Sequence, residues 1–385
     1  MKKIARCIFF ISILVNWHIS SLAQDSSHIR ISLLTCAPGN DELYEVFGHS
    51  GIRVTDSSSV TDYVFNYGTF DFGAPNFYMK FIRGKLLYYV SVEDFQDFKF
   101  AYQQDNRAIT EQVLNLSPEE KIKINEYLIN NTKEENKFYK YDFFFDNCTT
   151  RLRDIIENNK HPHPVIKPVM PIGTTFRQAI YLYLDKGKAY WGKLGIDILL
   201  GAKTDAVMTT AQSQFLPNNL MISLDSADNN HQLVLSKSDL FVTNSVRDNT
   251  SLFTPGILFT SIFLFIVLLS LSSNKIIQRF VSGFDGILFF ATGLLGILLI
   301  LMWTATDHVL CANNYNLLWA WPMHTVMAFY VHSKKRWVKK YYLFTAILLS
   351  VVLLSWFFLP QQMNNALIPI LLLLIYRSAN CYLKA

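Results

Sequence analysis

The stretch Tyr141–Asn158, YDFFFDNCTTRLRDIIEN, decides the fold of the first half of the chain. Four of its residues recur at the spacing of one apolar helix face, i, i+4, i+7 and i+8: Cys148, Leu152, Ile155 and Ile156. Asp146 or Asn147, just before this face, would cap the first helical turn. We therefore predict a helix that carries Cys148 in its first turn, on the side that faces the protein interior.

This position makes Cys148 a candidate nucleophile. Unpaired N–H groups and the helix dipole at a helix N-terminus favour a thiolate over a thiol. The alternative is a small core residue, because buried cysteines are usually inert. The residues around Cys148 are compatible with both interpretations, so the presence of a neighbouring base must decide between them.

A β-hairpin earlier in the chain offers such a base. Its strands are predicted over His49–Thr55 and Val60–Tyr67, around a polar turn at Asp56–Ser59. A register symmetric about this turn pairs Arg53 with Asp62, and cross-strand partners share one face of a sheet. A slip of one residue would move every side chain of one strand to the opposite face.

The same register pairs His49 with Asn66. A thiol nucleophile needs a base that takes its proton and a third group that orients the base. His49 would be this base for Cys148, and Asn66 would orient it. Tyr67 or Glu45 could fill the orienting role instead. The hairpin and the helix together predict a Cys-His-Asn active site.

The order of these parts along the chain indicates a fold. The strands that carry the base precede the nucleophile helix, which fits a circularly permuted papain-like fold of the NlpC type, an α+β fold. Lecithin:retinol-acyltransferase-like enzymes share this order, and triads are recognised by geometry and not by order. Further strands and helices are predicted at Ile29–Cys36, Leu87–Val92, Phe95–Gln104, Arg107–Leu116 and after an N-cap at Ser117.

The composition of the chain changes near Thr254. The sequence after this residue consists mainly of long apolar stretches, which predict membrane-spanning helices. We predict an all-α bundle of about five spans: Gly256–Leu271, Gly286–Trp303, Leu317–Val331, Tyr341–Leu359 and Ala366–Tyr376. Pro322 interrupts the third span, and His324 within it is expected to form a hydrogen bond between helices. The fifth span is short for a bilayer, which requires about 20 apolar residues.

The charges that flank these spans predict an orientation. The loop after the first span carries Lys275 and Arg279, and the loop after the third contains the cluster Lys334–Lys340. The positive-inside rule places these loops and the C-terminus in the cytoplasm, and the N-terminal domain on the other side. A basic and then apolar N-terminus, with a small-residue site at Ser21–Ala23, predicts a secretory signal peptide over 1–23 that agrees with this orientation.

Other features narrow the function. The net charge is +5, but the basic residues form no long patch in the N-terminal part, so no nucleic-acid partner is expected. His161 and His163 alternate with prolines and have no further ligands nearby, so no metal and no other cofactor is predicted.

Cys36 could form a disulfide with Cys311 if the N-terminal domain rests on the loop that holds Cys311.

Four motifs resemble the Lnb family, the Bacteroides-type lipoprotein N-acyltransferases: LTCAPG at Leu34–Gly39, FGHS at Phe47–Ser50, FNYGTFDF at Phe65–Phe72 and DNCTTR at Asp146–Arg151. That family joins a periplasmic thiol-enzyme domain to a C-terminal multi-span region. The resemblance covers nearly the whole mature chain. It implies a periplasmic thiol-acyltransferase-like domain over 24–254 and a membrane domain over 255–385, in the inner membrane of a bacterium.

The resemblance also implies an activity, with Cys148 as the acyl-accepting nucleophile and His49 as its base. A phospholipid would donate the acyl group to form a thioester, and the N-terminal amine of a diacylated lipoprotein would accept it. Two other hypotheses stand beside this one. The first is a periplasmic cysteine hydrolase of peptide, cell-wall or lipid ester bonds, which has less need of five spans. The second is a non-catalytic membrane assembly factor in which Cys148 is structural.

Overall fold

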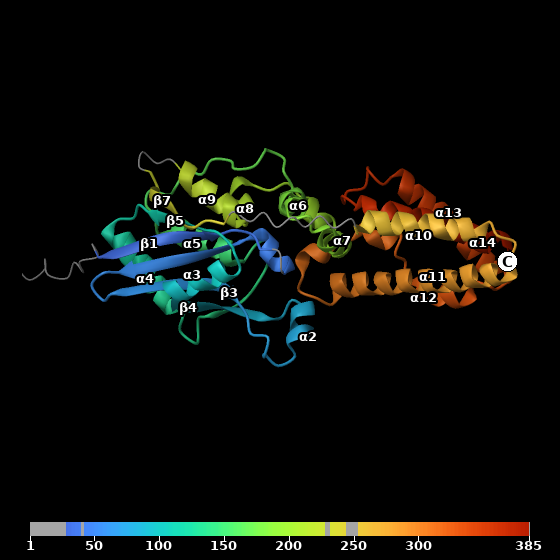
Figure 1. Cartoon of the computed structure of the whole chain (residues 1–385), viewed down its shortest axis with the longest axis horizontal. Helices are drawn as coiled ribbons and strands as arrows, with labels where there is room; N and C mark the ends of the chain where they lie inside the picture. Colours follow the sequence, from blue (N-terminus) through green and yellow to red (C-terminus); the bar gives the residue numbers. More distant parts are fainter. Residues whose placement is uncertain (1–27, 40–41, 228–231, 244–252, 385) are drawn as a thin grey trace, which may run out of the picture.

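The computed structural model describes residues 28–39, 42–227, 232–243 and 253–384. They form two parts that lie end to end, a sheet with flanking helices and a helical bundle (Figure 1). This agrees with the prediction of an α+β domain followed by an all-α region. The predicted signal peptide over 1–23 lies outside the described residues.

The sheet has seven antiparallel strands in the order β6-β4-β3-β2-β1-β5-β7. Their bounds are β1 (Ile29–Cys36), β2 (His49–Asp56), β3 (Thr61–Thr69), β4 (Leu87–Asp94), β5 (Ile109–Leu114), β6 (Phe138–Lys140) and β7 (Val234–Phe241). The strand that carries His49 is therefore the central one. β1 pairs with the whole of β2, and β3 pairs with β2 from Ile52 onward, so β1 fixes the backbone at His49.

Helices cover both faces of this sheet. Three of them share one face and a fourth covers the other: α4 (Pro118–Asn131), α5 (Cys148–Asn159) and α9 (Pro217–Ser226), with α3 (Phe95–Gln104) opposite. Ile31 and Leu33 of β1 pack in a buried core with Leu152 of α5. Leu34, which points the other way, packs with Phe98 of α3. The alternation of side chains along β1 thus serves two cores.

β2 and β3 form the predicted hairpin, but their register differs from the predicted one by two residues: Arg53 pairs with Val64, and not with Asp62. The Asp56 carboxylate accepts hydrogen bonds from two backbone N–H groups of the loop, so the loop begins only after Asp56. Val60 has a φ of 56° and belongs to the loop instead of pairing. A shift of two residues leaves each side chain on its predicted face, and Arg53 still donates to Asp62 at 2.7 Å.

The helix predicted after Ser117 is confirmed. The Ser117 hydroxyl accepts from the backbone N–H of Glu120, the Glu120 carboxylate accepts from the backbone N–H of Ser117, and Pro118 is the first helical residue. The other elements of the N-terminal part are η1 (Leu43–Phe47), α2 (Phe77–Ile82), α6 (Phe176–Lys186), α7 (Tyr190–Leu199), η2 (Ala202–Asp205) and α8 (Thr210–Ser213).

The C-terminal part consists of α10 (Pro255–Ser270), α11 (Lys275–Thr304), η3 (Val309–Cys311), η4 (Tyr315–Leu318), α12 (Met323–Met327), η5 (Ala328–Tyr330), α13 (Arg336–Leu354), η6 (Asn365–Leu367) and α14 (Ile368–Lys384). Within the described ranges, three helices are long and apolar enough to cross a membrane: Lys275–Thr304, Arg336–Leu354 and Asn365–Leu383. α10 is apolar but shorter. The chain is therefore a membrane protein in its C-terminal part.

Several predicted spans have other bounds, and one has another form. Tyr341–Leu359 corresponds to α13, which begins and ends five residues earlier, and Ala366–Tyr376 corresponds to α14, which extends to Lys384. α11 begins at Lys275 and not at Gly286, because Asp285, which precedes the predicted start, is buried in an ion pair with Arg377 at 2.6 Å. A charge that is paired inside the bundle does not end a membrane helix. The predicted span Leu317–Val331 is not one helix, since η4, α12 and η5 divide it.

Two glycines of α11 explain the shape of this interrupted segment. A Cβ atom on Gly293 would lie 2.1 Å from the backbone nitrogen of Thr325, and one on Gly296 would lie 2.0 Å from the carbonyl oxygen of Ala320. The backbone of the segment therefore rests directly on α11, a closeness that small residues permit in membrane bundles. Pro322 lies between the two contacts and prevents a continuous helix.

Arg177 of α6 joins the two parts of the chain. Its guanidinium is fully buried and donates to Asp197 at 2.8 Å and to Asp205 at 2.9 Å. The C-terminal part completes this network, because Asn364 donates to the Asp197 carboxylate at 2.8 Å and Asn316 donates to the Asp197 carbonyl oxygen at 2.9 Å. Buried charges are tolerated when each has a partner. The network holds the sheet domain against the loops at one end of the bundle.

Candidate active site

The first turn of α5 presents Cys148. Asn147 is the N-cap, because its side chain accepts from the backbone N–H of Thr150 at 2.8 Å and the Thr150 hydroxyl accepts from the backbone N–H of Asn147 at 2.8 Å. Cys148 is the next residue and the first of the helix. Asp146, the other predicted cap, instead forms an ion pair with Arg151 at 2.6 Å. The capped start fixes the direction of the Cys148 side chain.

The structure brings Cys148, His49 and Asn66 together. The Cys148 thiol forms a hydrogen bond with the His49 ring, although the two residues belong to different elements. Nε2 of His49 forms a second hydrogen bond with Oδ1 of Asn66. One imidazole thus contacts both the thiol and the carboxamide, which is the arrangement that a base and its orienting group require.

The two other groups predicted for the orienting role lie elsewhere. The Tyr67 hydroxyl is buried and has no hydrogen-bond partner among the residues that the structure describes. Glu45 forms an ion pair with Arg107 at 3.1 Å. Of the three predicted candidates, Asn66 contacts His49.

The regular pairing of β2 with β3 and of β3 with β4 ends at this site. The paired residues of β2 and β3 end at Ile52 and Phe65, and the pairing of β3 with β4 is irregular after Asn66. The backbone N–H of Ser50 donates to the Cys148 sulfur beyond the last paired residues. Gly68 has a φ of +92°, and a Cβ atom there would stand 3.7 Å from the Cβ atom of Cys148. The start of α5 therefore fits into the gap between the two strands.

The surroundings of Cys148 favour its thiolate. Burial alone raises the pKa of the Cys148 thiol, but the charge of His49, its hydrogen bond and the Ser50 N–H lower that pKa from 9.0 to about 7. Burial lowers the pKa of His49, whereas the proximity of Cys148 and the bond to Asn66 raise it above 6.5. Both shifts stabilise a thiolate beside an imidazolium, so this cysteine is poised for nucleophilic attack near neutral pH.

Cys36 gives a contrast within the same region. It pairs with His49 across β1 and β2, yet burial raises the pKa of its thiol to about 12. Cys36 and Cys311 are both buried free thiols, so they form no disulfide. His308 donates from Nε2 to the carbonyl oxygen of Phe81 at 3.2 Å, which is a contact between the two parts of the chain. Of these three cysteines, Cys148 alone has a lowered pKa, because burial also raises the pKa of Cys311 to about 11.

Two groups of the site were not predicted from the sequence. Glu93 accepts a hydrogen bond from the Asn66 side-chain nitrogen at 3.1 Å and so fixes the carboxamide that holds His49. Its partner on β3 is Val64, two residues from Asn66 on the same face, and the predicted strand ended one residue too early to include it. The Ser50 N–H is a backbone group, for which the sequence carries no signal.

Among the described residues there is no group of three or more His, Cys, Asp or Glu side chains that could bind a metal ion. The rings of His161 and His163 lie 5.0 Å apart in a loop.

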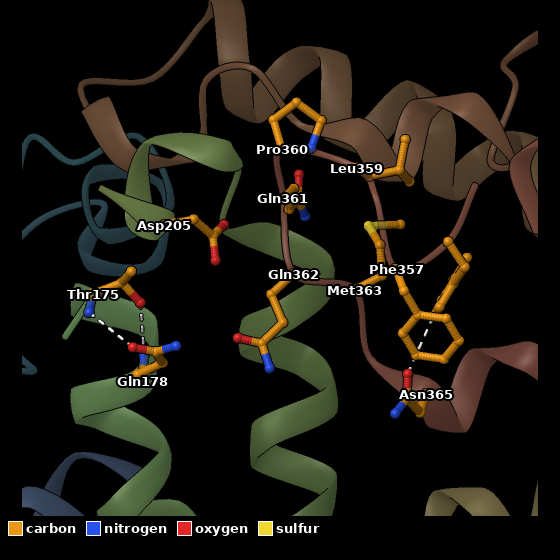
Figure 2. A pocket seen from close by; sticks show the side chains of 11 residues that line it. Thr175, Gln178, Asp205, Phe357, Leu359, Pro360, Gln361, Gln362, Met363 and Asn365 are labelled. Atoms are coloured by element: carbon orange, nitrogen blue, oxygen red, sulfur yellow. Dashed lines mark hydrogen bonds between the residues drawn. The ribbon is translucent and has the colours of Figure 1, made fainter. Parts of the chain in front are cut away.

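A cavity of about 290 Å³ lies at the junction of the two parts of the chain, away from Cys148. Figure 2 shows Thr175, the N-cap of α6, and Gln178 of α6 on one side of this cavity and Gln362 on the other. Thr175 and Gln178 form hydrogen bonds with each other as the cap of α6, so they are satisfied without a ligand. The cavity does not include the Cys148 site.

Two family models match the chain. The model described as the Lnb N-terminal periplasmic domain matches residues 16–178, which contain Cys148, His49 and Asn66. The model described as the Lnb transmembrane domain matches residues 247–385. A search of curated proteins and a search of solved structures find no match.

Proposed function

The chain belongs to the Lnb family, and we propose that it is a lipoprotein N-acyltransferase of the bacterial inner membrane. Membership of the family suggests a role of this kind, and the membrane helices agree with it. The observation that carries the proposal is the thiol of Cys148 at the start of α5, in a hydrogen bond with a histidine that Asn66 orients.

The first half of the reaction would load the enzyme. His49 takes the proton of Cys148, and the thiolate attacks the ester carbonyl carbon of a phospholipid. The tetrahedral intermediate collapses, the alcohol of the lysophospholipid leaves with the proton from His49, and the acyl group remains on sulfur as a thioester. The backbone N–H of Cys148, which has no acceptor within its own helix at this position, is a candidate donor to the oxyanion.

The second half would transfer the acyl group. The N-terminal amine of a diacylated lipoprotein attacks the thioester carbon and loses a proton to His49. The amide forms, the carbon–sulfur bond breaks, and the Cys148 thiol is restored by that proton. Asn66 holds one ring nitrogen of His49 throughout, so the other nitrogen stays directed at the reacting atoms.

The proposal extends to the fold of the N-terminal part. α5 packs on β2 and β3, both of which precede it in the chain. A helix that begins with the nucleophile and packs on the strand of the base is the arrangement of papain-like enzymes. The strands come first here, which supports a circularly permuted, NlpC-type version of that fold.

The proposed orientation has the N-terminal domain in the periplasm and the C-terminus in the cytoplasm. The loops that contact the N-terminal part follow α11 and α13, and they contain Asn316 and Asn364. The basic residues Lys275, Arg336 and Lys339 lie at the starts of these helices, at the opposite ends. This charge distribution supports the proposed topology, with about five passages through the bilayer.

The test is the intact mass of the purified full chain after incubation with phospholipid. Wild-type protein should gain one fatty-acyl mass at Cys148, and neutral hydroxylamine should remove it, because hydroxylamine cleaves thioesters. A diacylated lipopeptide with a free amine should also discharge the enzyme and itself gain the acyl group. The same incubation with Cys148→Ser should give no thioester.

Each of the other hypotheses has its own result in this experiment. An adduct that only water discharges would indicate a lipase, and an adduct formed from peptide would indicate a peptide hydrolase. Lipopeptide acylation by Cys148→Ala protein would refute the nucleophile. A folded wild-type protein that forms no adduct with any donor would support an assembly factor in which Cys148 is structural.

A further inference from the structure

The segment Phe72–Leu87, which contains α2, exposes an unusual number of large apolar side chains. At least half of the surface is exposed in each of five residues: Phe72, Tyr78, Met79, Phe81 and Ile82. Tyr78 reaches 76%. We call this segment the aromatic lip. A contiguous apolar surface of this kind marks an interaction site, because single exposed apolar residues are normal but clusters are not.

The position of the lip shows which surface it meets. The backbone N–H of Asp307 donates to the carbonyl oxygen of Arg83 at 2.9 Å, and His308 donates to the carbonyl oxygen of Phe81 at 3.2 Å. Both residues closely follow Thr304, the last residue of the membrane helix α11. The lip is therefore bound to the point where α11 leaves the bilayer. In Figure 1, α2 projects from the sheet domain toward this end of the bundle.

The charge of the lip fits a phospholipid surface. Lys80, Arg83 and Lys85 are exposed, and the sequence Phe72–Leu87 contains no Asp or Glu. Basic residues among exposed aromatic and aliphatic side chains are typical of segments that lie in the headgroup region of a membrane. Attraction to the anionic headgroups would make the binding free energy of each basic side chain there more favourable.

A row of aromatic rings leads from the lip to the nucleophile. Phe77 of α2 stacks with Phe70 at a centroid distance of 6.0 Å, Phe70 lies 5.3 Å from Tyr88, and Tyr88 stacks on Tyr141 at 4.4 Å. Tyr141 and Cys148 are neighbours, since a Cβ atom on Gly68 would lie within 4 Å of both. The rings therefore form a row of contacting side chains from the lip to the neighbourhood of Cys148.

We propose that the aromatic lip inserts its exposed side chains into the leaflet that faces the N-terminal domain, and that the rings behind it guide an acyl chain to Cys148. The insertion rests on exposure, charge and the contact with the loop after α11. The guidance of the acyl chain rests on the acyltransferase function proposed above. The two experiments below separate these claims.

The first experiment measures insertion without any turnover. The full chain with Cys148→Ala is placed in nanodiscs of phosphatidylethanolamine and phosphatidylglycerol, and Met79→Cys is labelled with an environment-sensitive fluorophore. The matched control is Val60→Cys, which is exposed in the β2–β3 loop at the other end of the hairpin. The described native thiols are buried, so the added cysteine is the preferred site of labelling.

Lipids with a spin label near the glycerol backbone should quench the fluorophore at Met79→Cys and leave the one at Val60→Cys unchanged. Replacing phosphatidylglycerol with phosphatidylcholine should weaken this quenching, because the anionic charge is then lost. Equal quenching at the two positions would overturn the insertion. A probe at Met79→Cys that is unquenched but shielded from water would also overturn it and would indicate a protein partner.

The second experiment measures delivery of the acyl chain. The double variant Tyr78→Ser with Phe81→Ser should form the thioester from bilayer phospholipid at least about tenfold more slowly, since burial of even one large apolar side chain contributes about that factor. Alkylation of Cys148 by iodoacetamide should be unchanged, which excludes damage to the site. The control is Phe100→Ser, an exposed aromatic on α3.

The outcomes separate the lip from the proposed function. If wild-type protein forms no thioester but Met79→Cys is quenched, the acyltransferase proposal fails and the insertion stands. If wild-type protein forms the thioester and the double variant does so at the same rate, the acyltransferase proposal stands and the guidance of the acyl chain fails.

Discussion

Nε2 of His49 donates a hydrogen bond to the side-chain oxygen of Asn66 on the neighbouring strand. An imidazole that carries its proton on Nε2 has a free lone pair on Nδ1, so this hydrogen bond favours the tautomer that, in the proposed mechanism, accepts the proton of Cys148. Glu93 holds the other end of the Asn66 carboxamide and prevents it from turning over. The hydrogen-bonded row of Glu93, Asn66 and His49 thus favours one tautomer of the histidine.

Removal of the orienting group should slow the reaction without abolishing it. We expect Asn66→Ala to lower the rate of thioester formation by about tenfold to a hundredfold, similar to the loss when the partner of a metal-bound histidine is removed. His49→Ala should cost more, about 10²–10⁴-fold, because it removes the base itself. Single-turnover mass spectrometry measures both rates. Full activity of Asn66→Ala would contradict the orienting role.

The pH dependence of alkylation tests the thiolate directly. The pKa of Cys148 is lowered to about 7, so its reaction with iodoacetamide should rise as the pH passes through 7 and should fall below it, where the thiol is protonated. His49→Ala removes the charge and the hydrogen bond that lower this pKa while burial still raises it, so the profile should move to higher pH. Peptide mapping should find no label on Cys36, whose pKa is about 12. An unchanged profile in His49→Ala would disprove the coupling of the two groups.

The buried ion pairs of Arg177 at the junction should raise the free energy of unfolding. Arg177→Met would leave Asp197 and Asp205 without their cation in a buried site, and we expect a loss of about 3–5 kcal/mol of unfolding free energy. The control is Lys193→Met, whose ion pair with the exposed Asp185 should contribute about 0–1 kcal/mol. Thermal unfolding of both variants in the same detergent compares them. Similar melting temperatures would show that the junction network does not stabilise the fold.

The glycines of α11 provide a second stability test with a control on the same helix. Gly296→Ala would place a Cβ atom 2.0 Å from the carbonyl oxygen of Ala320, so the interrupted segment must move, at a cost of about 1–3 kcal/mol. A Cβ atom on Gly283 would meet no heavy atom within 4 Å, and Gly283→Ala should be neutral or stabilising. The melting temperature of Gly296→Ala should therefore fall, whereas that of Gly283→Ala should stay unchanged or rise. Equal effects would mean that α11 and the segment are not in close contact.

The parts of the site that the sequence predicts are those with local signals. The helix of Cys148 follows from apolar spacing and a cap, and the hairpin of His49 follows from alternation around a polar turn. The predicted register was wrong by two residues because the side chain of Asp56 begins the loop later than composition suggests. Asn66 nevertheless lies beside His49, because the error was even and the period of a strand is two.

The parts that could not be predicted depend on contacts between distant segments. Glu93 contacts Asn66 only through the pairing of β3 with β4, which no residue near Glu93 specifies. Arg177 and Asp197 look like ordinary charges of amphipathic helices in the sequence. Their complete burial results from the approach of the membrane loops, and the local pattern carries no trace of that approach.

The contact of Gly293 and Gly296 with the interrupted segment also bears on how the protein is made. The segment of η4, α12 and η5 lacks the continuous hydrogen bonds of a helix, so alone it would expose unpaired backbone groups to lipid. α11 precedes it during synthesis and provides a glycine-lined groove in which those groups are shielded. We therefore expect the segment to enter the membrane together with α11. If α11 were encoded after the segment, we expect those backbone groups to stay unshielded until α11 is made.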